Sequence, residues 1–202
     1  MQPALTHLRA SDPVMARLID EIGPYAIEFL EPDFATLAKA IVLQQLSGKV
    51  AEIIFNRLVV AAAGDGRLTP QGVLKLRTQK LRALGLSRQK IGYLRELARR
   101  TISGQVDFAV LAALPDEEVH QRLTALKGIG PWTVHMFLIF ALRRLDVMPS
   151  ADLGIRAAVR KVYGLAQMPL PAEVDRLARK WKPYSSVASW YLWRSLETKA
   201  GL

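Results

Sequence analysis

Residues 126–137 read LKGIGPWTVHMF and place two glycines and a proline between two segments of helical period. Gly128 and Gly130 allow backbone conformations that a Cβ atom would forbid, and Pro131 presets the first turn of the next helix. The segment therefore predicts a tight turn between two helices, with backbone amides exposed at a helix N-terminus. Such a turn is suited to an anion. The alternative is a glycine-rich helix connection that binds nothing.

Most of the remaining chain also carries a helical period rather than strand alternation, so the fold class that we expect is all-α. The segment 132–144 is apolar on nearly every side, which is typical of a buried central helix. Only 107–111 and 146–148 would suit short strands. We expect helices at about 12–22, 34–46, 49–63, 88–101, 132–144, 150–162, 171–181 and 184–198, with others beginning near 70, 78 and 115.

The charge and the cysteine content restrict the function. Lysine and arginine number 28 against 18 aspartates and glutamates, a net charge of +10 that favours a polyanionic partner such as nucleic acid, ribosome or membrane surface. The absence of cysteine excludes disulfides, thiolate chemistry and iron–sulfur clusters. Three scattered histidines do not predict a zinc site. The N-terminus has no apolar signal core and no segment reaches membrane-spanning length, so we expect an intracellular protein.

Four segments carry a resemblance to a known family. They are AIVLQQLSGKVAEIIFNRL at 40–58, LGLSRQKIGYLRELA at 84–98, the LKGIGPWT turn followed by Asp152 in MPSADLGIRAAV, and WKPYSSVASWYLW at 181–193. In this order they resemble the helix–hairpin–helix DNA glycosylase superfamily. The closest branch is the 3-methyladenine DNA glycosylase II type, which removes alkylated bases. The resemblance covers nearly the whole chain.

The resemblance implies an all-α fold of two helical lobes, with DNA across a cleft between them. We expect residues 33–147 to form one lobe and to present the helix–hairpin–helix, at about 118–140. Residues 1–32 and 148–202 would form the other lobe.

The implied activity is hydrolysis of the N-glycosidic bond of 3-methyladenine and 7-methylguanine in duplex DNA, after the nucleotide has been flipped into a pocket. Asp152 lies 22 residues after Gly130 and matches the family's catalytic aspartate, which stabilises an oxocarbenium-like transition state or orients water. Its position also suits a helix N-cap, and the two roles are compatible. Members that nick the strand carry a lysine where this chain has Trp132, so we expect no Schiff base.

Aromatic residues are expected to line the base pocket, because an alkylated base is cationic and stacks well on their faces. Trp132 and Trp193 match aromatic pocket positions of the family. Met136, one turn after Trp132, is a further pocket candidate. The alternative for all three is ordinary core packing. Tyr184 suits either the pocket rim or a helix cap.

The hairpin is expected to bind a DNA phosphate, and the resemblance implies that its carbonyls, at Gly128 and Gly130, can also hold a monovalent cation. We expect no other metal and no cofactor. The phosphate contacts assigned to this turn are Lys127, Gly128, Ile129, Gly130 and Thr133. The side chain of Ile129 is expected to pack inward and fix the turn, while the amides around the two glycines face the phosphate.

The turn Gln44-Gln45-Leu46-Ser47 matches the one that fills the gap in the opened duplex. Gln45 aligns with the inserted residue and Leu46 is adjacent, so which of them enters stays open. The alternative places Leu46 in the core and uses the glutamines to cap the helix end.

Three further basic residues are candidates for contacts with DNA. Arg88 and Lys90 suit phosphate contacts, with solvated surface as the alternative. Arg156 lies one helical turn after Asp152 and suits its orientation, a phosphate contact or an i,i+4 ion pair.

The expected partner is damaged double-stranded DNA, bound by a monomer without any membrane, in the cytoplasm (nucleoid) or the nucleus. Two rival functions remain open. One is a non-catalytic helix–hairpin–helix module that binds DNA without releasing a base. The other is a glycosylase for deaminated bases or 1-methyladenine.

Overall fold

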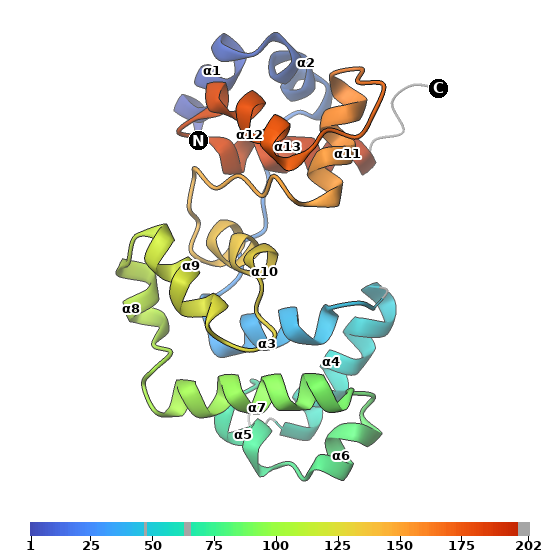
Figure 1. Ribbon diagram of the computed structural model, residues 1–202, viewed down its shortest axis with the longest axis vertical. Coiled ribbons are helices and arrows are strands. Elements are labelled where there is room, and N and C mark those ends of the chain that lie inside the picture. The colour runs from blue at the N-terminus through green and yellow to red at the C-terminus, as the bar shows by residue number, and fades with distance from the viewer. Residues whose placement is uncertain (47, 63–65, 198–202) are drawn as a thin grey trace. The chain divides into compact units, whose positions relative to one another are not determined.

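The computed structural model describes residues 1–46, 48–62 and 66–197, and its regular elements in these ranges are all helical. The all-α prediction is therefore confirmed. Two compact units are present: unit 1 combines Met1–Phe29 with the described residues from Leu138 onward, and unit 2 is Leu30–Phe137 (Figure 1). The helix break expected at Ser47 and the helix ends expected at 63 and 198 lie outside the described residues.

The boundary near residue 147 differs from the expected one, because residues 138–147 pack with the two ends of the chain. Phe140 stacks on Trp193, with ring centroids 5.8 Å apart. Asp146 Oδ1 accepts a hydrogen bond from the Ser185 hydroxyl at 2.5 Å. These contacts join the segment to unit 1 rather than to the hairpin lobe.

Unit 2 is organised around the amphipathic helix α7, against which α3, α5 and α6 pack (Figure 1). The inner face of α7 is buried, as its spacing predicts: Ile91, Leu94, Leu97 and Ala98. The helices of unit 2 are α3 (Phe34–Leu43), α4 (Gly48–Ala62), α5 (Pro70–Lys75), α6 (Thr78–Ala83), α7 (Arg88–Ile102), α8 (Phe108–Ala113), α9 (Asp116–Thr124) and α10 (Pro131–Met136).

The glycine-rich turn joins α9 to α10, as predicted, but the following helix is not a single one over 132–144. It ends at Met136 and continues as a π-helical turn, Phe137–Ala141, and Arg143 then adopts a left-handed φ of 58°. The widened turn needs i→i+5 pairing, which no hydropathy pattern distinguishes from an α-helix. The possible strand at 107–111 is instead α8, which Asp107 caps by accepting N–H bonds from its first turn.

Unit 1 contains α1 (Gln2–Ser11), α2 (Pro13–Ile22), α11 (Leu153–Val162), α12 (Pro171–Ala178), a 3₁₀ turn at Arg179–Trp181 and α13 (Ser185–Glu197). Helix α1 was not expected from the sequence. The core of this unit comes from both ends of the chain and includes Leu8, Met15, Ile155, Trp181 and Tyr191.

A buried carboxylate, Asp12, joins these segments. Its oxygens accept hydrogen bonds from the amide of Val14 at 2.9 Å, from Trp181 Nε1 at 2.8 Å and from the Tyr163 hydroxyl, and Lys180 Nζ lies 3.0 Å away. Burial by itself would raise the pKa of Asp12, but the four donors outweigh it and hold the pKa below the ordinary value. Asp12 is thus a polar anchor between α2, α11 and the 3₁₀ turn.

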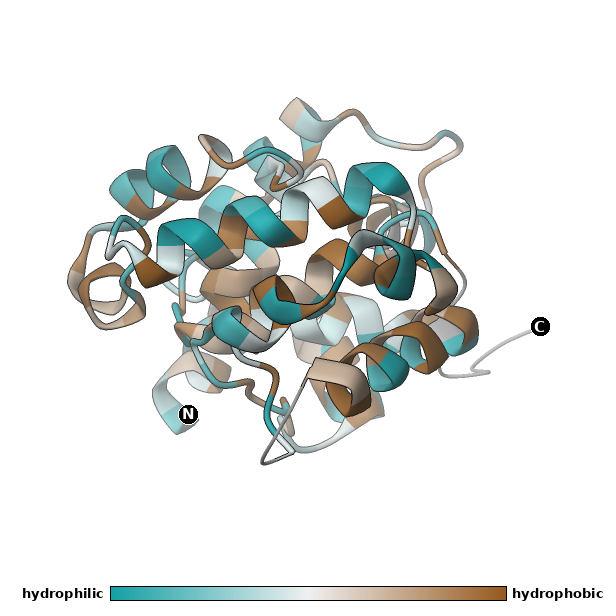
Figure 2. Ribbon diagram, turned by 90° about the horizontal axis from the view of Figure 1, so that it is seen from below, coloured by the Kyte–Doolittle hydropathy of each residue, from teal (hydrophilic) through white to brown (hydrophobic). Residues whose placement is uncertain are grey.

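Hydrophobic and hydrophilic residues alternate around the helices of both units, as Figure 2 shows. This is the pattern of helices that bury one face. Among the described residues, no helix combines the length and the apolar character that crossing a membrane would require.

Candidate functional site

Asp152 is the N-cap of α11 and is half-buried. Its Oδ1 accepts the backbone N–H of Ile155 at 2.8 Å and the indole N–H of Trp193 at 3.0 Å. The cap predicted from the sequence is therefore present, and a long-range donor is added to it. Together the two bonds fix the direction of the carboxylate, because one comes from its own helix and the other from α13.

Gly154 makes the approach of Trp193 possible. A Cβ atom built on Gly154 would lie 3.0 Å from Asp152 Oδ1 and 3.2 Å from Trp193 Cδ1, closer than such contacts normally come. The glycine lies inside the first turn of α11, where it costs helix stability relative to alanine. That unfavourable glycine was a signal in the sequence that pattern reasoning passed over.

Trp193 also packs against Phe140, with the ring planes at 27°. The contact partly agrees with the core-packing alternative, and the hydrogen bond to Asp152 gives this tryptophan a second role. The segment that leads to Asp152 is held by α13 as well, because Val147 N donates to the Ser186 hydroxyl at 2.9 Å. Helix α13 therefore orients both the carboxylate and the chain that carries it.

The other pocket candidates are distributed over both units. Tyr184 lies in unit 1, where its ring makes an edge contact with His7 at 5.5 Å and packs against the core. Trp132 and Met136 lie on α10 in unit 2, and Met136 is half-buried. Trp132 is 49% exposed, so core packing is not its role.

The two hairpin glycines differ. Gly128 has a left-handed φ of +87°, and a Cβ atom there would lie 2.1 Å from Cδ2 of Tyr93 on α7. Gly130 has φ −98° and ψ 173°, and nothing lies within 4 Å of its Cβ position. The need for glycine is therefore confirmed at Gly128, whereas the expected backbone constraint at Gly130 is wrong. Ile129 is buried between them, as predicted, and fixes the turn.

Of the side chains assigned to phosphate on this turn, Lys127 is exposed and Thr133 is buried. The side chain of Thr133 therefore packs inside unit 2, and a contact between Thr133 and phosphate stays a prediction. The expected cation ligands are engaged as well. Gly128 O accepts Gln44 Nε2 at 2.7 Å and Gly130 O accepts Val134 N at 3.1 Å. Each of these carbonyls therefore already accepts one hydrogen bond from the protein.

The turn after α3 is exposed at its tip. Gln45 has a left-handed φ of 56° and Leu46 is 39% exposed, so the alternative that buries Leu46 in the core is wrong. Gln44 does not cap the helix with its side chain but donates to Gly128 O. The other residue of the turn, Ser47, lies outside the described residues.

Two of the basic candidates have structural partners. Lys90 Nζ donates to Val42 O at 2.8 Å and to Gln44 O at 2.6 Å, so its ammonium is directed at backbone rather than at a phosphate. Arg156 Nε donates to Pro169 O at 2.7 Å. Arg88 is exposed at the start of α7.

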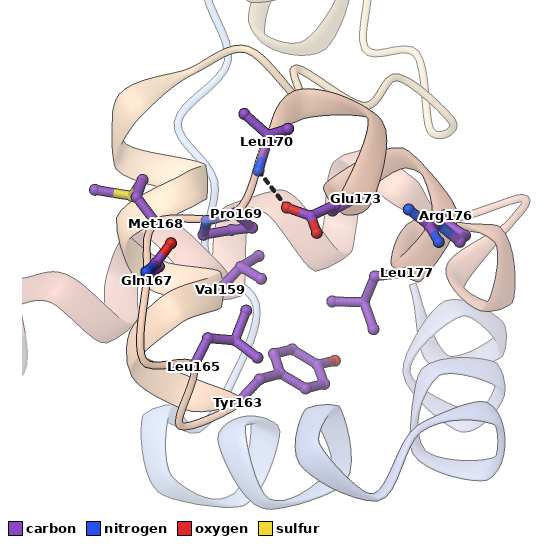
Figure 3. A pocket seen from close by; sticks show the side chains of 10 residues that line it. All are labelled: Val159, Tyr163, Leu165, Gln167, Met168, Pro169, Leu170, Glu173, Arg176 and Leu177. Carbon is purple, nitrogen blue, oxygen red and sulfur yellow. Dashed lines mark hydrogen bonds between the residues drawn. The ribbon is translucent and has the colours of Figure 1, made fainter.

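Two cavities differ in character. One of about 510 Å³ in unit 2 is polar and is lined by the hairpin, the turn after α3 and the start of α7, with Lys90 and Lys127 in its wall. Another of about 760 Å³ in unit 1 is lined by Tyr163, Leu165, Met168 and neighbouring residues (Figure 3). Neither Asp152 nor Trp193 lines the second cavity, so it is not the pocket expected for the base. No group of three or more potential metal ligands occurs among the residues that the structure describes.

Comparison with known proteins gives the hairpin and Asp152 a context. Residues 38–183 match the family described as HhH-GPD superfamily base excision DNA repair protein. The chain belongs to this superfamily. The match includes the turn after α3, the hairpin, Asp152 and the 3₁₀ turn of unit 1.

The HhH-GPD chain also resembles individual proteins over nearly its full length. It is 38% identical over 194 residues to DNA-3-methyladenine glycosylase 1 of Schizosaccharomyces pombe, covering 94% of this chain and 85% of that one. The solved structure of the S. pombe 3-methyladenine DNA glycosylase Mag1 in complex with abasic DNA has a TM-score of 0.88 at 36% identity and covers 99% of both chains. The DNA-3-methyladenine glycosidase of Bacillus halodurans has a TM-score of 0.87 at 32% identity, covering 97% of this chain and 90% of that one.

Proposed function

We propose that this chain is a monofunctional DNA glycosylase that hydrolyses the N-glycosidic bond of alkylated bases, 3-methyladenine and 7-methylguanine, in duplex DNA. The observation that carries the proposal is the oriented carboxylate of Asp152, fixed by Ile155 N and Trp193 Nε1 in a chain of the HhH-GPD superfamily. The names of its relatives support the choice of alkylated bases.

The chemistry required of Asp152 is modest. A base alkylated on a ring nitrogen is cationic, so the electron pair of the glycosidic bond leaves with it and neutralises it. Positive charge develops on the sugar, where a carboxylate stabilises it. Water adds at C1′, and its proton passes to Asp152 and then to solvent. The products are a free base and an intact strand with an abasic sugar.

Binding of the duplex is assigned to the hairpin and to the net charge of +10. The amides of the turn and the exposed Lys127 would neutralise a phosphate without reading sequence. The exposed ring of Trp132 is available for stacking on a cationic base. We propose that the chain acts as a monomer on damaged duplex, in the compartment that holds the DNA.

Release of the base should identify the substrate. The protein is incubated with duplexes that contain 3-methyladenine, 7-methylguanine, 1-methyladenine, uracil or hypoxanthine, and the free bases are separated by chromatography. We expect release of the first two well above that of the others. Tight binding of every duplex with no release would instead support a non-catalytic binding module. Preferential release of a deaminated base would refute the assignment to alkylation damage.

The absence of strand nicking rests on one position. A Schiff base needs an amine beside the sugar carbon, and Trp132 occupies the place where strand-nicking members carry lysine. Lys127 precedes the hairpin glycines and is exposed. We therefore expect cleavage of methylated duplex only after treatment with alkali, and no adduct in borohydride. A protein–DNA adduct trapped by borohydride would show that a covalent imine forms.

A further inference from the structure

The last turn of α3 has an unusual cap. The final carbonyls of an α-helix lack partners within the helix and need external donors. Here the donor comes from another helix: Lys90 Nζ on α7 bonds Val42 O at 2.8 Å and Gln44 O at 2.6 Å. A cation at this end also interacts favourably with the helix dipole. Burial lowers the pKa of Lys90, as expected for an ammonium drawn out of solvent.

The residue that Lys90 holds by its backbone reaches the hairpin with its side chain. Gln44 Nε2 donates to Gly128 O at 2.7 Å, across 84 residues of sequence. Helix α7 packs against the same glycine, because the ring of its Tyr93 occupies the space where a Cβ atom of Gly128 would lie. The end of α3, the start of α7 and the hairpin are therefore linked by hydrogen bonds and packing within unit 2.

The residue that follows these contacts is in a conformation that needs support. Gln45 has a φ of 56°, a region that non-glycine residues occupy only where their surroundings hold them. Gln45 and Leu46 are both exposed, so their own side chains add little to hold the turn. The hydrogen bonds of Lys90 and Gln44 are therefore the contacts that hold this backbone conformation.

We propose that Lys90 and Gln44 are positioning residues, which fix the exposed turn at Gln45 and Leu46 relative to the hairpin. The turn that fills the opened duplex and the turn that binds the backbone then contact the DNA in one register. This inference rests on the proposed function, because it assigns the exposed turn to the gap left by a flipped nucleotide.

A plain electrostatic role for Lys90 predicts something different. A lysine that contacts a phosphate contributes to the affinity for any duplex. Its loss reduces the slope of log K against log salt concentration by about one. A lysine that positions the turn instead contributes to the distortion of damaged DNA, because the turn enters only an opened duplex. Binding of undamaged DNA and distortion of damaged DNA therefore separate the two roles.

The test uses Lys90→Met and Gln44→Met, which keep much of the side-chain bulk and remove the donors. Lys75→Met, at an exposed lysine of α5, is the matched control for the loss of one charge from unit 2. The probe is a duplex with a stable abasic analogue beside 2-aminopurine, whose fluorescence reports disrupted stacking and needs no base release. Affinity for undamaged duplex is measured over a range of salt, and thermal unfolding is followed in parallel.

We expect both variants to lose most of the fluorescence change and to release methylated bases at least tenfold more slowly than wild type. Their affinity for undamaged duplex and its salt dependence should stay within about twofold of those of Lys75→Met, as expected if phosphate contacts are unchanged. Lys90→Arg should restore much of the signal, because it keeps a charged donor. The double variant should be no worse than the worse single one, because both act on one turn.

Three outcomes would overturn the inference. They are an unchanged fluorescence response in both variants, a loss of undamaged-duplex affinity in Lys90→Met beyond that of Lys75→Met, or a wild-type protein that binds the abasic duplex without any response. If Lys90→Met does not fold, Gln44→Met tests the inference by itself, because that variant keeps the hydrogen bonds of Lys90 to the backbone. A wild-type protein that distorts the abasic duplex but releases no base refutes the proposed function and leaves the inference standing.

Discussion

Replacement of Gly128 by alanine should damage the hairpin before any DNA is present. The backbone at Gly128 is left-handed, with φ +87°, and the new Cβ atom would lie 2.1 Å from Cδ2 of Tyr93. Rotation of the ring about its own axis cannot relieve the overlap, because Cγ of Tyr93, which lies on that axis, is itself only 2.4 Å from the new Cβ atom. Two separate costs therefore act at one position.

The backbone cost alone is about 1–2 kcal/mol for a residue with a Cβ atom in the left-handed region. In a chain of this length, each 1 kcal/mol lowers the Tm by about 2–4 °C, so the expected fall is at least about 2–8 °C. Displacement of the Tyr93 ring adds to this value. Thermal unfolding followed by circular dichroism measures it.

Gly130→Ala is the matched control in the same turn. The backbone there is extended and nothing lies within 4 Å of the new Cβ atom, so the Tm should not change. If a phosphate approaches the Gly130 amide, the added methyl group should still weaken binding of undamaged duplex. Fluorescence anisotropy at low and high salt measures this affinity. An equal Tm for Gly128→Ala and wild type would refute the reasoning, and so would an equal loss of Tm in both variants.

Two further predictions concern unit 1. Gly154→Ala should leave the Tm nearly unchanged, because the gain in helix stability from alanine, about 1 kcal/mol, offsets the unfavourable new contact. Base release should nevertheless fall at least about tenfold, because the Cβ atom displaces the Asp152 carboxylate or the Trp193 indole. Single-turnover release at the wild-type rate would contradict this prediction. The lowered pKa of Asp12 contributes stability that is complete above the unfolded pKa of about 3.9 and is lost as the pH falls through the lower folded pKa. Urea unfolding is followed from about pH 6 down to about pH 2, where a carboxyl group titrates. The free energy of unfolding should fall less steeply with decreasing pH in Asp12→Asn than in wild type. Equal slopes would exclude Asp12 as a source of the pH dependence.

The features that the sequence predicted correctly are local ones. Helical period sets the fold class, and the buried Ile129 follows from a single apolar residue between two glycines. The cap at Asp152 follows from an acid just before a helical pattern. Each of these depends on residues within a few positions of one another, so a single sequence contains the information.

The features that it did not predict depend on the packing of distant segments. Lys90 was predicted to contact phosphate, because the carbonyls that it binds instead lie more than 40 residues away in the sequence and no local pattern identifies them. The partner of Asp152 is the indole of Trp193, which stands 41 residues along the chain. Gly130 shows another limit, since a glycine in a sequence does not reveal whether its φ is positive. The burial of Thr133 was not predicted for a related reason: it depends on which face of α10 packs inward.

The central claim is that the charge of Asp152 drives base release, and the most direct test is single-turnover release of 7-methylguanine by Asp152→Asn. Asparagine keeps a side-chain oxygen for Ile155 N and Trp193 Nε1 and is itself a good N-cap, so the variant removes the charge and retains the geometry. We expect release to fall by at least about a thousandfold, the loss of roughly 4 kcal/mol of transition-state stabilisation, while the affinity for methylated duplex is unchanged or higher. Release within a few-fold of the wild-type rate would show that Asp152 is a helix cap and that the catalytic group lies elsewhere.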